Sequence, residues 1–252
     1  MLIRNKSLFM KGFLLFVSFL CVFTSIFMPI WGGKGNGLDA ADDMFNRLSK
    51  GSSYFIPEVQ KKLVKVDGKQ ITLTVKIKAN DAAKALKIDE ATLAAQALVN
   101  LKKAGAEAEY KGGAITYTGD LGKILAAALV DADDLFNERG PAVVERYALN
   151  VKDAEKIVVN AWWVVLDPSI KELQKQKMIN EANIVSSVNK RGIEPGYNFY
   201  GIKGEKVLDN VLPLSGLLIF YVVYTMWYGY AIFDMFGGIG MGMSKPKVKQ
   251  EV

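Results

Sequence analysis

The sequence predicts an α+β protein, in which two tandem and duplicated small α/β units lie between an N-terminal and a C-terminal transmembrane helix. Two long uncharged stretches, one near each end of the chain, predict the membrane helices. Strand-like alternation and turn dipeptides between them predict the α/β units. A partial similarity between the two halves of the intervening region predicts the duplication.

The two uncharged stretches are long enough to cross a bilayer. Residues 12–31 and 211–233 contain no charged side chain. A helix rises ~1.5 Å per residue, so ~20 residues span the ~30 Å hydrocarbon layer. We therefore expect transmembrane helices at 12–31 and 211–236. Residues 1–11 then form a basic tip, and residues 237–252 form a Gly/Lys tail.

The first apolar stretch could also belong to a cleaved secretory signal, because Arg4, Lys6 and Lys11 precede it. However, it is longer than the ~7–15 apolar residues of a usual signal peptide, and no A-x-A-like cleavage site follows it. An uncleaved membrane anchor is therefore favoured over a signal peptide.

The unbalanced positive charge lies at the two ends of the chain. Residues 32–210 hold 26 basic and 24 acidic side chains, whereas Lys245, Lys247 and Lys249 follow the second apolar stretch. Basic residues near membrane helices stay in the cytoplasm. We therefore expect an inner (plasma) membrane protein with both termini cytoplasmic and residues 32–210 extracytoplasmic. No basic face is left over for a nucleic acid, so none is expected as a partner.

Residues 38–118 are expected to form the first α/β unit. Residues 39–50 read as a helix, which Gly51 is placed to end. The segments LVKV (63–66) and ITLTVKI (71–77) flank Asp67-Gly68, a dipeptide that favours a type I′ turn. These features predict a hairpin made of two strands.

A helix is expected next, over about residues 81–103, with Gly105 as its stop. The run AEAEY-KGG-AITYT then predicts a second hairpin. Asp120 can cap a following helix that ends at Gly140-Pro141.

Residues 119–205 are expected to form the second α/β unit. The segment ADDMFN (41–46) recurs as ADDLFN (132–137), and an offset of 87 positions matches Gly105, Glu107 and Tyr110 with Gly192, Glu194 and Tyr197. Coincidence among common residue types is the alternative. Under the duplication, residues 157–165 (IVVNAWWVV) correspond to the strand ITLTVKI. Such an apolar run predicts a strand buried on both faces, with Trp162 or Trp163 either in the core or against a partner.

The residues for most catalytic chemistries are missing from the sequence. The chain has no histidine, its single cysteine (Cys21) lies in the first apolar stretch, and it carries no nucleotide-binding loop. The clustered aspartates Asp131, Asp133 and Asp134 are expected on a solvated polar face, with a weak cation site as the alternative. We therefore expect no enzyme activity, no cofactor and no metal.

The second apolar stretch is rich in aromatic residues at helical spacing, which favours contact with another helix. Asp234 is expected to be a structural residue at the membrane boundary. Because intramembrane carboxylates are often functional, the alternative is that it pairs with a partner or takes part in proton transfer. The candidate partner interface comprises Trp162, Trp163, Tyr221, Tyr224, Trp227, Tyr228, Asp234, Gly238 and Gly242.

Three functional hypotheses remain. The first is a non-enzymatic accessory or scaffold subunit of a larger membrane protein complex, whose partners are other membrane subunits or copies of itself, together with the lipid bilayer. The second is a homo-oligomeric ring or export scaffold, since the layout is similar to that of ring-building modules of bacterial secretion and flagellar bases. The third is an extracytoplasmic ligand-binding or sensor protein that acts through a partner.

Overall fold

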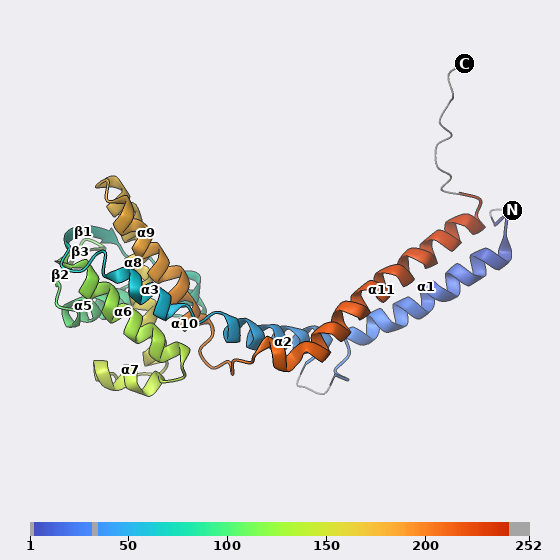
Figure 1. The fold of residues 1–252 in the computed structure, drawn as a ribbon, viewed down its shortest axis with the longest axis horizontal. Coiled ribbons are helices and arrows are strands. Elements are labelled where there is room, and N and C mark those ends of the chain that lie inside the picture. Colours follow the sequence, from blue (N-terminus) through green and yellow to red (C-terminus); the bar gives the residue numbers. More distant parts are fainter. Residues whose placement is uncertain (1–2, 32–34, 242–252) are drawn as a thin grey trace, which may run out of the picture. The chain divides into compact units, whose positions relative to one another are not determined.

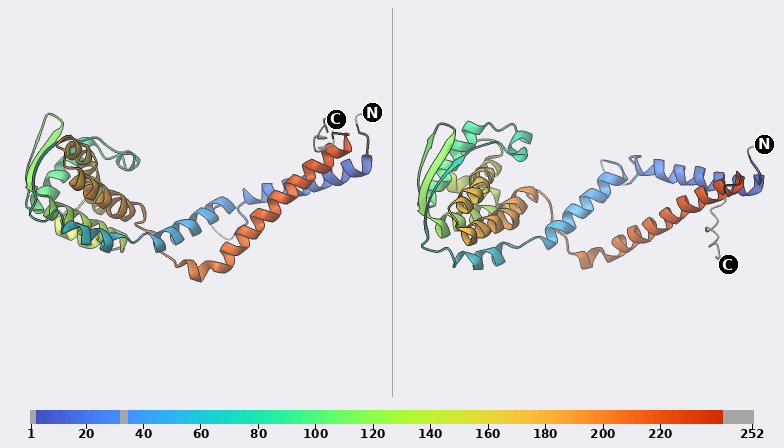
Figure 2. Two further views of the ribbon diagram at one scale, coloured as in Figure 1. Left: turned by 45° about the horizontal axis from the view of Figure 1, so that its top comes forward. Right: turned by 90° about the horizontal axis from the view of Figure 1, so that it is seen from above.

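The computed structural model describes residues 3–31 and 35–241, which form helices and a small sheet (Figures 1 and 2). The chain divides into a helical unit (residues 1–48 and 205–252) and an α+β unit (residues 49–204). The elements are, in order, α1 (Lys6–Ile26), α2 (Gly37–Ser52), α3 (Ile56–Leu63), β1 (Gln70–Lys76), α4 (Asp81–Ala85), α5 (Glu90–Lys103), β2 (Glu107–Lys111), β3 (Ala114–Asp120), α6 (Leu121–Phe136), α7 (Gly140–Tyr147), α8 (Ala154–Lys175), α9 (Ile179–Val188), the π-helical turn η1 (Asn189–Ile193), α10 (Glu194–Asn198), the 3₁₀ turn η2 (Val207–Asn210) and α11 (Val211–Gly238).

The helical unit is built on two helices, α1 and α11, that run side by side in opposite directions (Figure 2). Both are long and apolar enough to cross a membrane. Asn5 caps the start of α1 by accepting a hydrogen bond from the Leu8 amide, 3.1 Å away. The structure thus agrees with the expectation of one apolar helix near each end of the chain.

The α+β unit contains a three-stranded antiparallel sheet in the order β1-β3-β2. In β1, residues alternate between exposed and buried, so that Ile71, Leu73 and Val75 face the core. The opposite face carries polar cross-strand pairs, among them the hydroxyls of Thr72 and Thr118 at 2.9 Å. The sheet therefore has one buried and one solvated face.

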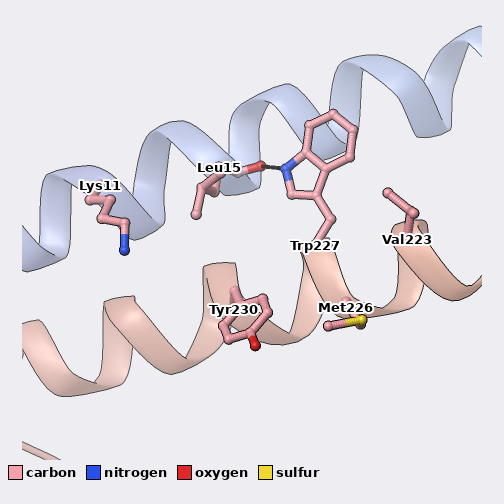
Figure 3. A pocket seen from close by; sticks show the side chains of 6 residues that line it. All are labelled: Lys11, Leu15, Val223, Met226, Trp227 and Tyr230. Carbon is pink, nitrogen blue, oxygen red and sulfur yellow. Dashed lines mark hydrogen bonds between the residues drawn. The ribbon is translucent and has the colours of Figure 1, made fainter.

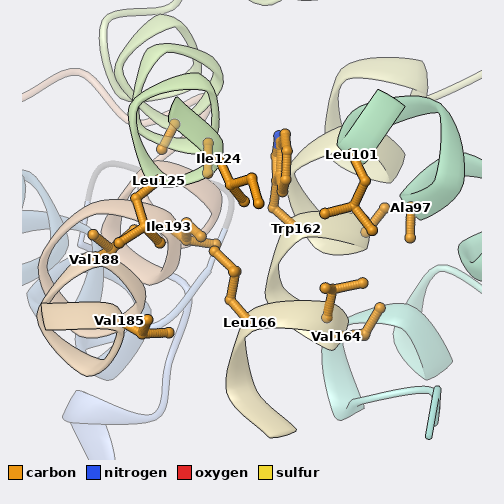
Figure 4. Close-up of a cluster of buried hydrophobic side chains, with 14 of the residues drawn as sticks. Ala97, Leu101, Ile124, Leu125, Trp162, Val164, Leu166, Val185, Val188 and Ile193 are labelled. Atoms are coloured by element: carbon orange, nitrogen blue, oxygen red, sulfur yellow. The ribbon is translucent and has the colours of Figure 1, made fainter. Parts of the chain in front are cut away.

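Helices cover the buried face of the sheet, with α8 next to β1 and α5 next to β2. Trp162 of α8 lies at the centre of the core, between Leu101 of α5 and Ile124 of α6 (Figure 4). Leu166 extends the same core toward α9 and η1 (Figure 4). A single hydrophobic core thus holds the α+β unit together.

The two ends of the α+β unit meet. A Cβ atom built on Gly204 would lie 3.3 Å from Lys50 Cγ and 3.5 Å from the amide nitrogen of Gly51. The buried Lys50 ammonium reaches across, to Glu138 at 2.5 Å and to the carbonyl oxygen of Phe199 at 3.0 Å. These contacts hold the first and the last residues of the α+β unit next to each other.

Several sequence predictions are confirmed. The helix expected at 39–50 is part of α2, and the strand expected at 71–77 is β1. The second hairpin is β2–β3, whose turn residues Gly112 and Gly113 have φ angles of +60° and +79°. Asp120 caps α6 through hydrogen bonds from the Gly122 and Lys123 amides.

The first predicted hairpin is wrong. Leu63 is the last residue of α3, and β1 pairs with β3 instead of with residues 63–66. The turn at Asp67-Gly68 joins a helix to a strand, with Gly68 at a φ of +72°. The helix expected over 81–103 is also divided, into α4 and α5, because Asp89 starts a new helix by capping the Thr92 amide at 2.6 Å.

The strand predicted at 157–165 is wrong as well. These residues lie inside α8, and the run is apolar because that helix is covered on nearly all sides. The structure does not show two duplicated units. Residues 154–198 are helical apart from short turns, whereas their counterparts under the 87-residue offset include β1 and β2.

Candidate functional site

The tip of the helical unit, where α1 begins and α11 ends, is closed by backbone contacts. The amides of Arg4 and Asn5 both donate to the carbonyl oxygen of Gly238 at 2.9 Å. A Cβ on Gly238 would lie 2.5 Å from Phe9 Cβ and 2.7 Å from Phe9 Cα. Glycine therefore permits the approach of the two helices at this position. Gly242, the other predicted glycine, lies outside the described residues.

One turn further along, Gly12 of α1 lies against the backbone of α11. A Cβ on Gly12 would lie 2.6 Å from the Met235 amide nitrogen and 2.7 Å from the Ala231 carbonyl oxygen. Any larger side chain would push the two helices apart. Gly12 is thus a close-packing position of the helix pair.

Asp234 lies beside Gly12 and pairs with Lys11. The Lys11 ammonium is 2.9 Å from Asp234 Oδ2, with 68% of the lysine side chain and 8% of the aspartate side chain exposed. That carboxylate oxygen accepts no well-directed hydrogen bond, so the attraction is ionic. Asp234 is therefore paired within its own chain.

Aromatic side chains continue the contact between the helices. The Trp227 indole N–H donates to the carbonyl oxygen of Leu15 at 3.0 Å (Figure 3). The ring of Phe19 lies 4.6 Å from that of Tyr224 and 5.1 Å from that of Tyr228, measured between centroids. Of the predicted interface residues, Tyr224, Trp227 and Tyr228 thus contact α1, as Asp234 and Gly238 also do.

Tyr221 of α11 is largely exposed. Its side chain is 64% exposed, and its hydroxyl makes no hydrogen bond within residues 3–31 and 35–241. The hydroxyls of Tyr224 and Tyr228 likewise make no hydrogen bond within the described residues, but Tyr221 is the most exposed of the three. Because a phenol in hydrocarbon favours a polar partner, Tyr221 is a candidate for contact with another subunit.

Among the grooves that border α11 within the described residues, two reach the predicted interface residues Trp227 and Tyr228. One, of about 580 Å³, is lined by Lys11, Leu15, Val223, Met226, Trp227 and Tyr230 (Figure 3). The other, of about 290 Å³, is lined by apolar and aromatic side chains between Tyr228 and Met241. Apart from the Lys11 ammonium, the first groove is bounded mainly by aromatic and aliphatic groups.

In the α+β unit, Asp131 is buried at the centre of a polar network. Its Oδ2 accepts hydrogen bonds from the Tyr147 hydroxyl at 2.6 Å and from the Trp162 indole N–H at 2.7 Å. Its Oδ1 pairs with the Arg146 guanidinium. Burial raises the pKa of Asp131 above its ordinary value, although these hydrogen bonds oppose the shift.

Asp133 and Asp134 extend the network toward the surface. Arg139 contacts Asp133 at 2.6 Å and Asp134 at 2.7 Å, and Arg146 contacts Asp134 at 2.5 Å. Partial burial by itself raises the pKa of Asp134, but the hydrogen bonds from the two arginines outweigh it and hold that pKa below its ordinary value.

The solvated polar face predicted for these aspartates is therefore wrong. Asp131 and Asp134 are buried, and the helix turns them toward α7 and α8. Arginine side chains neutralise them, so their oxygens are engaged as hydrogen-bond acceptors.

The two predicted interface tryptophans differ in position. Trp162 has no exposed surface and belongs to the core. Trp163 is half-buried, and its ring lies 6.0 Å from that of Tyr197 in an edge-to-face arrangement. The structure does not bring either of them together with the aromatic residues of α11 in a common unit.

The sequence analysis did not predict the roles of Lys11 and Gly12. Lys11 was assigned to the basic tip and Gly12 to the first membrane helix, and neither was considered as a contact residue. A usable signal existed. Lys11 and Asp234 are the charges that border the two stretches, so an antiparallel helix pair would set them opposite each other.

No protein-family model, curated protein or solved structure matches this chain. Its function therefore has to be argued from the geometry described above.

Proposed function

We propose that this protein is a non-enzymatic, membrane-anchored accessory or scaffold subunit of a larger membrane protein complex. In this proposal the α1–α11 pair spans the inner (plasma) membrane. The α+β unit lies outside the cytoplasm and offers a surface for protein–protein contact.

The exposed apolar surface of α1 and α11 carries the proposal. Their contact buries few side chains, and large apolar groups remain open to the surroundings, including Leu212 at 85% and Leu14 at 62% exposure. A soluble monomer rarely exposes apolar surface on this scale. Lipid or other membrane subunits would cover it.

The lengths of the helices fit this role. The 21 residues of α1 extend about 31 Å, close to the hydrocarbon thickness. The 28 residues of α11 extend about 42 Å, so this helix would tilt or reach beyond the hydrocarbon at one end.

The orientation argument rests on charge. Arg4 and Lys6 stand at the end of the helix pair where α11 also finishes, and the sequence after α11 carries three further lysines. Basic residues on one side favour retention of that side in the cytoplasm. The contacts of Gly12 and Lys11 with α11 also favour an anchor that is kept in the mature protein.

The proposal of a contact role for the α+β unit rests on its chemistry. The sequence has no histidine, and the carboxylates of α6 are engaged by arginine. Tyr221 supports contact within the membrane, because its exposed hydroxyl would gain a partner there.

The test is affinity purification of the full chain in mild detergent, followed by mass spectrometry. We expect other membrane proteins in stoichiometric amounts. Tyr221→Leu should lower their recovery, whereas Leu218→Ala, which changes a similarly exposed residue of the same helix, should leave it unchanged.

Other results of the same purification would favour one of the alternative functions. A large assembly that contains this chain alone would favour the homo-oligomeric ring or export scaffold. A clean monomer that a small metabolite stabilises against heat would favour the ligand-binding or sensor protein. A clean monomer without such a ligand would refute the proposal.

A further inference from the structure

The groove at Lys11 has a polar mouth and an apolar floor. Lys11 of α1 lies at one end and Val223 of α11 at the other, with Tyr230 between them (Figure 3). Leu15 and Met226 line the space between them. Val223 and Tyr230 are seven positions apart, which corresponds to about 10 Å along the helix.

The charge at the mouth faces outward. Asp234 is buried on the inner side of the Lys11 ammonium, whereas most of the lysine side chain is exposed. An ammonium has three donors, so the contact with one carboxylate leaves others free. Arg4 and Lys6, both exposed at the same end of α1, add positive charge nearby.

The depth of the groove matches a bilayer. Lys11 is five residues from Lys6, the first residue of α1, which is about 7.5 Å along the axis. With α1 spanning the bilayer, Lys11 lies near the headgroups, and Leu15 and Val223 lie at the depth of the acyl chains.

We propose that this groove binds a phospholipid with an anionic headgroup. The headgroup phosphate contacts the Lys11 ammonium, and one acyl chain lies along Leu15, Val223 and Met226. The positive charge at the mouth complements an anionic lipid. An apolar helix from another subunit would instead cover the ammonium donors that Asp234 does not engage and leave them without an acceptor, which is unfavourable in hydrocarbon.

This inference rests on the membrane location in the proposed function. Trp227 lines the groove, so its fluorescence reports what fills it. The full chain carrying Trp31→Phe is reconstituted into vesicles that contain brominated phosphatidylglycerol or brominated phosphatidylcholine, since bromine on the acyl chains quenches a nearby indole. Trp162 and Trp163 belong to the α+β unit and give a constant background.

We expect brominated phosphatidylglycerol to quench Trp227 at about fivefold lower mole fraction than brominated phosphatidylcholine. Lys11→Gln should abolish this preference, and Lys11→Arg should retain it. Lys6→Gln, the matched control, should change it little. Inorganic phosphate in the buffer should leave it unchanged.

The other outcomes overturn the inference in distinguishable ways. Equal quenching by both lipids leaves the membrane location standing but removes the anionic-lipid site. A preference that free phosphate abolishes assigns the groove to a soluble anion. Protection of Trp227 from both lipids, while Trp31 is quenched in the unsubstituted chain, assigns the groove to a protein partner. The absence of quenching for both tryptophans refutes the membrane location itself.

Discussion

The Lys11 ammonium lies 2.9 Å from the Asp234 carboxylate, and the partners differ sharply in exposure. Removing the lysine alone would leave a buried, unpaired carboxylate. We expect Lys11→Met to destabilise the helix pair, and Lys11→Met combined with Asp234→Leu to recover most of the loss. The coupling energy should fall within roughly 0.5–3 kcal/mol. Thermal unfolding of the four proteins in detergent measures it, and strictly additive losses would show that the pair contributes nothing.

The close contact at Gly12 predicts a steric effect. Gly12→Leu should separate α1 from α11, because the added atoms would overlap the backbone of Met235. The readout is an intramolecular disulfide between Leu8→Cys and Gly237→Cys, detected by mass in a Cys21→Ser background. Gly216→Leu is the control, since no atom lies within 4 Å of a Cβ built there. Efficient cross-linking in Gly12→Leu would contradict the close approach.

The buried network around Asp131 predicts a large loss of stability. Asp131→Ala would leave the Trp162 indole and the Tyr147 hydroxyl without their acceptor and would remove one of the two carboxylates that pair with Arg146, at a cost of about 3–5 kcal/mol. Chemical unfolding of the full chain, followed by tryptophan fluorescence, measures this cost. Asp81→Asn, at a fully exposed helix start, should unfold like the parent protein. A small effect of Asp131→Ala would mean that the network adds little to the core.

Asp131 and Asp134 predict opposite dependences on pH. The raised pKa of Asp131 means that its contribution to stability is present below its ordinary pKa of 3.8 and is lost as the pH rises through the folded value. The lowered pKa of Asp134 means that its contribution is present above 3.8 and is lost as the pH falls through the folded value.

Asp131→Asn should therefore destabilise the protein more at about pH 3 than at about pH 7, and Asp134→Asn should do the reverse. Denaturant midpoints of both variants and the parent, taken at the two pH values, provide the comparison. The same pH trend in both variants would refute the assigned shifts.

The proposed topology predicts which positions a membrane-impermeant maleimide can reach. In a Cys21→Ser background, Lys111→Cys at the exposed end of β2 should be labelled in intact spheroplasts. Lys6→Cys should be labelled only after the membrane is opened. The reverse pattern would show that the charge rule assigns the wrong side.

Local signals predicted much of the fold. The alternation in β1, the glycine pair at 112–113 and the cap at Asp120 each depend on neighbours in the sequence, so they could be recognised without the structure. The two apolar helices could be recognised for the same reason, since their length alone sets them apart.

Tertiary context decided the rest. The run at 157–165 is rich in β-branched and aromatic residues, yet it forms a helix because α5, α6 and α9 surround it. Likewise, the sequence around Asp131 is typical of a surface helix. Its burial depends on Arg146, fifteen positions later, which the fold brings back to pair with it. In the candidate site, the helical spacing of the aromatic residues in α11 predicted a contact face. The pairing of Lys11 with Asp234 could not be predicted from spacing, because it depends on which helix lies opposite.

The meeting of Gly204 with Lys50 and Gly51 gives the α+β unit the geometry of an inserted module. Its attachment points are neighbours, so another compact domain with adjacent ends could replace it while the anchor helices keep their pairing. Such an exchange would separate the evolution of the α+β surface from the evolution of the α1–α11 pair. The same helix pair would then support different attached domains.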